Sequence, residues 1–243
     1  MKKILFVLLV ISVFTFFGCG ESSIPEAVKN LFIPGAVKKV RSSDLEKMQK
    51  EADESAKRYR AQLESAEKVR TNYEKLGRRY ADNGNWTPAI DCLTKALGYG
   101  SVSADTHYVL GASYANRAKE TGNKNDMDMA ESHYTKSMTK NPELVSAQYG
   151  LGLLVFYLKK DYPRGIQIMK ELTVRKPDFF EGRFALGRLY YENGEVARAL
   201  SVYEDLYSAL QSRKDSNVTQ EMRDNCKANI TRIMNELQTQ SIK

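Results

Sequence analysis

The sequence has little of what most catalytic and metal sites require. Its 243 residues include only two histidines and three cysteines. His107 and His133 lack the spacing of a zinc site and have no cysteine partner, so core or surface positions are favoured for both. Nucleophile elbows, phosphate loops and zinc-binding motifs do not occur. The sequence therefore indicates a protein that is not an enzyme and needs no metal.

Proline is also scarce, with six residues, and β-type patterns are missing. From position 44 onward helix-forming residues dominate, and no stretch there alternates apolar and polar residues as a strand does. The apolar content of 42% is enough for one medium domain with a continuous core. We therefore expect an all-α fold.

A concentrated basic surface is missing as well. The net charge is +7, and Lys2 and Lys3 at the extreme N-terminus account for two of these charges. The other basic residues are mixed with acidic ones and form no dense stripe with interleaved aromatic residues. The pattern is that of a solvated surface, so nucleic acid is not an expected partner.

Residues 1–18 have the pattern of an export signal. A short basic start precedes an almost unbroken apolar run from Ile4 to Phe17, which is too short for a comfortable membrane span. Gly18 and Cys19 follow, and this segment resembles a bacterial lipobox. The resemblance implies cleavage before Cys19 and a diacylglycerol on its sulfur. Phe16 and Phe17 depart from the usual residues there, and the alternative is an ordinary signal that happens to end in cysteine.

Acyl chains on Cys19 would anchor the protein to a membrane. Lipoproteins retained in the inner membrane often carry Asp in the next position, where this chain has Gly20. The resemblance thus implies an outer-membrane location, facing the periplasm. Residues 19–43 hold prolines, glycines and serines without helical periodicity, and we interpret them as a flexible tether.

A long helix is predicted next, over residues 44–69. Ser43 and Glu46 fit a capping box, with Ser43 as the N-cap. Apolar or small residues then recur every three or four positions from Leu45 to Tyr80, which marks one helical face. We expect this helix to run into the first repeat or to pack on it; a dimer formed through it is the less favoured alternative.

The main signal is a repeated Leu-Gly pair, followed three positions after the glycine by Tyr in three copies and by Val155 in the third. The pairs are Leu76-Gly77, Leu110-Gly111, Leu151-Gly152 and Leu186-Gly187. Pro142 and Pro177 close the second and third copies. The pattern resembles the tetratricopeptide repeat (TPR), a helical hairpin of about 34 residues.

The resemblance predicts a TPR-type α-solenoid of about four stacked hairpins, because one hairpin cannot bury its apolar face alone. The second copy carries about seven extra residues, and the third carries one, after Val155. Residues 212–243 have apolar positions at helical spacing and are expected to form a capping helix and tail. The predicted repeats are 70–103, 104–144, 145–179 and 180–211.

The same resemblance assigns a concave face to the first helix of each repeat. Aromatic residues with an occasional arginine are typical of contact surfaces. The alternative, of equal weight, is that these rings only pack against neighbouring helices. The register is least certain at the two residues after Val155. The predicted partner-binding residues are Arg78, Tyr108, Asn116, Tyr149, Phe156, Tyr157, Phe184, Arg188 and Tyr191.

Lipid, tether and repeat array together resemble the plan of outer-membrane assembly factors, pilus-assembly lipoproteins and cell-wall hydrolase adaptors. The hypothesis is a membrane-anchored, periplasm-facing scaffold that binds a protein or peptide in its groove, in an envelope assembly or maintenance complex. The alternative is a lipoprotein whose groove closes around a small apolar molecule for a transporter. Apart from the lipid on Cys19, no cofactor is expected.

Overall fold

The computed structural model describes residues 42–100, 102–213 and 219–241, and every regular element in these ranges is helical. The export signal, Cys19 and nearly all of the tether lie outside the described residues. None of the described helices combines the length and the apolar character needed to cross a bilayer. The predicted all-α fold is confirmed.

The first helix, α3, runs without interruption from Ser42 to Asp82. It therefore continues into the first repeat. Ser43 lies inside the helix, so its predicted role as N-cap is wrong; Ser42 Oγ instead donates a hydrogen bond to a carboxylate oxygen of Glu46 at 3.2 Å. The chain divides into two units after Tyr59, and the helical residues before that point are exposed.

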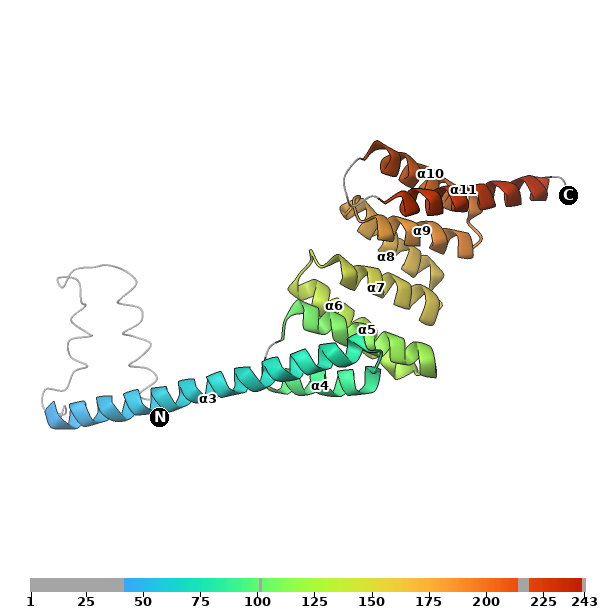
Figure 1. Ribbon diagram of the computed structural model, residues 1–243. Coiled ribbons are helices and arrows are strands. Elements are labelled where there is room, and N and C mark those ends of the chain that lie inside the picture. Colours follow the sequence, from blue (N-terminus) through green and yellow to red (C-terminus); the bar gives the residue numbers. More distant parts are fainter. Residues whose placement is uncertain (1–41, 101, 214–218, 242–243) are drawn as a thin grey trace, which may run out of the picture. The chain divides into compact units, whose positions relative to one another are not determined.

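After α3 the helices follow one another in antiparallel pairs (Figure 1). Within the second unit, each helix packs against its neighbours along the chain, and α11 closes the stack on α10. The helices are α4 (Trp86–Gly98), α5 (Ala104–Thr121), α6 (Lys124–Lys140), α7 (Val145–Leu153), α8 (Tyr162–Arg175), α9 (Phe180–Glu192), α10 (Val196–Ser212) and α11 (Gln220–Ser241).

The glycine of each Leu-Gly pair lets the two helices of its hairpin approach closely. A methyl group at any of these glycines would come within 3.1 Å of a large side chain on the second helix. Close contact rather than backbone conformation therefore favours glycine at these positions, most strongly at Gly77, Gly111 and Gly187, as the repeat pattern predicts. The four contacts are Gly77 with Leu93, Gly111 with Tyr134, Gly152 with Met169 and Gly187 with Tyr203.

The extra residues of the second repeat lengthen its helices and leave the connection short. Gly122 takes the left-handed conformation that ends α5, with φ 70°, and the side chain of Asn123 caps α6. Near this turn, Arg117 donates two hydrogen bonds of 2.7 Å to the carboxylate of Asp126, whose side chain is only 3% exposed. This buried pair joins the extended ends of α5 and α6.

The single extra residue of the third repeat is accommodated by a π-helical turn, η2 (Leu154–Leu158). In this turn the backbone N–H of Lys159 donates a hydrogen bond to the carbonyl of Leu154, five residues earlier, which is the spacing of a π-helix. The turn shifts the register of the residues within it. Phe156 is consequently 2% exposed and packs against Gly165 of α8. Phe156 was predicted on the concave face; that prediction is wrong, because a partner cannot reach a core side chain.

Candidate functional site

Two open hollows lie along the first helices of the hairpins, and Arg188 of α9 lines both. The first, called here the α5–α9 hollow, has a volume of about 520 Å³ and receives side chains from α5, η2 and α9. The second, the α9–α11 hollow, has about 670 Å³ and is bounded by α7, α9, α10 and α11. Together they form the candidate site.

Tyr157 and Arg188 meet at the wall of the α5–α9 hollow. The guanidinium carbon of Arg188 lies 5.6 Å from the centroid of the Tyr157 ring, within the range of a cation–π contact. The Tyr157 hydroxyl is buried and makes no well-formed hydrogen bond among the described residues. Burial, together with the nearby Glu192 carboxylate, raises the pKa of Tyr157 to about 12. This hydroxyl therefore stays neutral.

Aromatic rings also form much of the α9–α11 hollow. Tyr149 and Phe184 line it, each held by another ring. Tyr149 meets Phe179 edge to face with centroids 5.5 Å apart, and Phe184 lies 6.3 Å from Tyr203. Such pairs fix the orientation of these half-buried rings, so the hollow presents an ordered apolar surface.

The cap helix α11 supplies the opposite wall of the second hollow. The Arg232 guanidinium lies 4.6 Å from the centroid of the Tyr191 ring, and the Tyr191 hydroxyl donates a 2.7 Å hydrogen bond to Glu236. Arg232 also donates to the amide oxygen of Asn229 at 3.2 Å. Tyr191, predicted as a partner contact, thus fastens α11 to α9.

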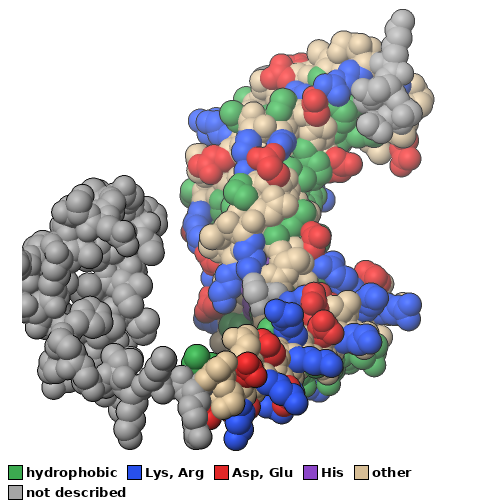
Figure 2. Space-filling model, turned by 90° about the vertical axis from the view of Figure 1, so that its left-hand side faces the viewer, with side chains coloured by type: hydrophobic (Ala, Val, Ile, Leu, Met, Phe, Trp, Pro, Cys, Tyr) green, Lys and Arg blue, Asp and Glu red, His purple; other side chains and the backbone are tan. Residues whose placement is uncertain are grey.

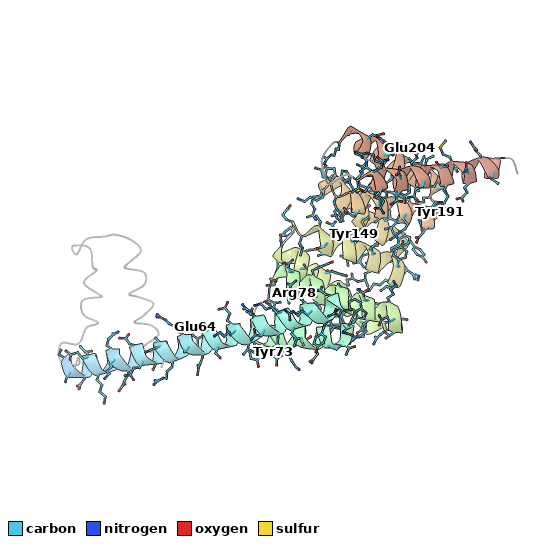
Figure 3. All side chains as sticks on the ribbon, in the orientation of Figure 1. Glu64, Tyr73, Arg78, Tyr149, Tyr191 and Glu204 are labelled. Carbon is cyan, nitrogen blue, oxygen red and sulfur yellow. The ribbon has the colours of Figure 1, made fainter. Side chains whose placement is uncertain are left out.

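The structure gathers five of the nine predicted contact residues around the hollows and leaves the others elsewhere. Arg78 lies at the opposite end of the array from Tyr191 (Figure 3), where it donates to the Thr106 hydroxyl at 3.3 Å. Tyr108 is half-buried beside Tyr134, with ring centroids 6.2 Å apart. The five lining residues are Asn116, Tyr149, Tyr157, Phe184 and Arg188.

Sequence reasoning missed the polar residues that α11 and the end of α5 contribute. Lys119 lines the first hollow, while Asn225, Asn229 and Arg232 line the second. The three on α11 are spaced by four and three residues, beside the apolar stripe that was used to predict a cap. That polar spacing was the available signal that the cap helix has a second, groove-facing side.

Charge around the site is mixed. On the face shown in Figure 2, basic and acidic side chains are interspersed over the described residues. Within the described ranges, no three histidine, cysteine or acidic side chains are grouped as a metal site would need. The two histidines instead contact each other in the core, with their Nδ1 atoms 3.0 Å apart.

Comparison with known proteins agrees with this architecture. The tetratricopeptide repeat family matches residues 159–214. The structure of PilF from Pseudomonas aeruginosa is similar, with a TM-score of 0.54, 18% identity and 72% of each chain covered. TTC0263, a thermophilic TPR protein of Thermus thermophilus, gives the same score and identity, covering 73% of this chain and 93% of its own. A search of curated sequences found no match.

At these identities the structural matches establish the fold alone. The local family match covers the second helix of the third hairpin and the whole fourth hairpin, where Gly187 makes its close contact. TPR scaffolds are typical of protein–protein interaction and are generally non-catalytic. Residues 159–214 thus match the tetratricopeptide repeat family, and the described residues form a TPR-type α-solenoid.

Proposed function

We propose that this chain is a lipid-anchored, periplasm-facing scaffold that holds a segment of a protein partner across its two hollows, within an envelope assembly or maintenance complex. The observation that carries the binding role is the pair of adjoining hollows, with ordered aromatic walls and one shared arginine. Aromatic residues and Arg are the residue types that contribute most binding energy at protein interfaces.

A protein segment fits these hollows better than a small molecule does. Small-molecule sites bury most of the surface of their ligand. Both hollows here are open along one side, and Arg188 between them is half exposed. An extended segment can occupy both and remain continuous with the rest of its protein, so we rank the transporter-accessory alternative second.

Photocrosslinking in intact bacterial cells tests the binding role. A photoreactive amino acid replaces Tyr149 or Phe184, and crosslinked products are identified by mass spectrometry. The matched control carries the same residue at Val174, which is 75% exposed on α8 and lines neither hollow. We expect a discrete protein product from the two hollow positions only. Equal products from all three positions, or none from the hollow positions, would contradict the proposal.

The anchor rests on the sequence around Cys19 and is tested separately. Cells grown with a labelled fatty acid should label the wild-type protein and leave Cys19→Ala unlabelled. The labelled protein should fractionate with outer membranes. Retained label in Cys19→Ala would show that the acyl chain, if present, is attached elsewhere.

A further inference from the structure

Among the described residues, Arg188 alone lines both hollows. Its side chain is 52% exposed, so a bound segment passing from one hollow to the other would run across its guanidinium. The residue therefore lies where a partner would have to make contact in the middle of its bound segment.

The charge of Arg188 is only weakly compensated within the described structure. Its Nε lies 3.9 Å from a carboxylate oxygen of Glu192, which is beyond hydrogen-bond distance. The pair has Arg before Glu at a spacing of four, the less favourable order on a helix, and both side chains are exposed. By contrast, Arg117 holds its buried carboxylate with two bonds of 2.7 Å.

The guanidinium is nevertheless held in place. It lies over the Tyr157 ring, which fixes one face of the planar group. About half of the Arg188 side chain is exposed, and a guanidinium presents its donors in the fork geometry that suits a carboxylate. A partner carboxylate would therefore meet a positioned donor and would lose little entropy in ordering it.

The surroundings favour a partner of a particular composition. A second cation stands in each hollow, Lys119 in the first and Arg232 in the second, against one carboxylate each, Glu192 and Glu181. The remaining walls are largely aromatic or aliphatic. Across the described lining of the two hollows, three cations including Arg188 therefore face two carboxylates, and apolar surface flanks Arg188.

Resting on the proposed function above, we infer that the partner is an acidic peptide segment in which one Asp or Glu side chain pairs with Arg188 and apolar side chains on either side of it enter the two hollows. Arg188 is then the residue that determines specificity. Selection depends on charge, because an uncharged segment would leave the guanidinium covered and without a carboxylate.

A random peptide library displayed on phage tests this inference against the full-length protein held in detergent micelles. We expect enriched peptides to carry an Asp or Glu between two apolar residues. Fluorescence anisotropy of one enriched peptide should show at least tenfold weaker binding to Arg188→Gln and to Arg188→Glu. Changing the peptide acid to Lys should abolish binding to the wild type and restore it with Arg188→Glu.

Arg198→Glu is the matched control. Arg198 also lies over a tyrosine ring, that of Tyr190, at 5.9 Å, is 70% exposed and lines neither hollow. It should leave the affinity within twofold. Enriched peptides without an acid, or failure of the charge-swapped pair to recover, would overturn the inference while leaving the scaffold proposal intact. No enrichment at all would overturn both.

Discussion

Acidification should destabilise the second hairpin through its buried histidine pair. His107 of α5 and His133 of α6 are 5% and 4% exposed, and their Nδ1 atoms are 3.0 Å apart. One nitrogen must donate and the other accept, which requires at least one neutral ring. The ring of Tyr114 stacks on His133 with centroids 5.7 Å apart and offers no negative charge.

The direction of the stability change follows from the protonation state that the folded protein prefers. Burial, then the neighbouring His107 and Lys136, lowers the pKa of His133 from 6.5 to about 4. Burial and the charges of Lys140 and Lys136 also lower the pKa of His107. Between pH 6.5 and 4 the unfolded chain therefore binds more protons than the folded protein. The contribution of the neutral histidines to the free energy of unfolding is complete above pH 6.5 and is lost as the pH falls toward 4.

The size of the effect can be worked out for His133 alone. A shift from 6.5 to about 4 corresponds to roughly 3 kcal/mol once the pH is below both values. Between pH 7.5 and 5.0 the loss is about 2 kcal/mol, because the folded protein is then still almost entirely unprotonated at this site. His107 adds to the loss in the same direction.

Urea unfolding followed by circular dichroism measures the difference between pH 7.5 and 5.0. The matched variant replaces both histidines by Gln, which keeps polar groups at the two positions and removes the titration. We expect the wild type to lose about 2 kcal/mol more than the variant over this interval. An equal loss in both proteins would refute the reasoning, since the acid sensitivity would then arise from other groups.

Three further predictions concern stability, each measured by urea unfolding at pH 7.5. Gly111→Ala should lower the free energy of unfolding by about 1–3 kcal/mol, because the added methyl would lie 2.8 Å from a ring carbon of Tyr134; an unchanged value would mean that the ring moves aside freely. Lys160→Gly should raise it by about 0.5–1 kcal/mol, because Lys160 has φ 60°, whereas Lys160→Ala should give no gain. Asp126→Ala should lower it by about 1.5–3 kcal/mol by removing the carboxylate that accepts two hydrogen bonds from Arg117, and a loss below about 0.5 kcal/mol would contradict this.

The fold was predictable because its main constraint is steric and local. A glycine that must accept a large side chain from the partner helix recurs once per hairpin, and this spacing is visible in the sequence as Leu-Gly. The start of α3 was not predictable to the residue. Ser42 and Ser43 are both acceptable near a helix start, and the sequence pattern favoured Ser43 although the helix already includes Ser42.

The candidate site was only partly predictable from helical register. Tyr157, inside the π-helical turn, lines a hollow, whereas Tyr108 and Tyr191, on regular helices, line neither. The repeat register predicted Asn116, Tyr149, Phe184 and Arg188 as partner-binding residues. All four line the hollows, since α5, α7 and α9 keep an unbroken α-helical period up to these residues. The register failed at Phe156, inside the π-helical turn, because sequence shows that one residue is extra but not how the backbone absorbs it. A loop at that point would have given a different set of exposed rings.

That turn also explains how the two hollows come to share one arginine. The extra residue turns Phe156 into the core and leaves its neighbour Tyr157 at the wall of the α5–α9 hollow. Tyr157 thereby becomes the ring on which Arg188, from the next hairpin, rests. Phe156 in turn meets Tyr157 with centroids 5.0 Å apart, so the core ring supports the wall ring. The departure from the repeat pattern that made the register uncertain is therefore what positions the central cation of the proposed binding surface.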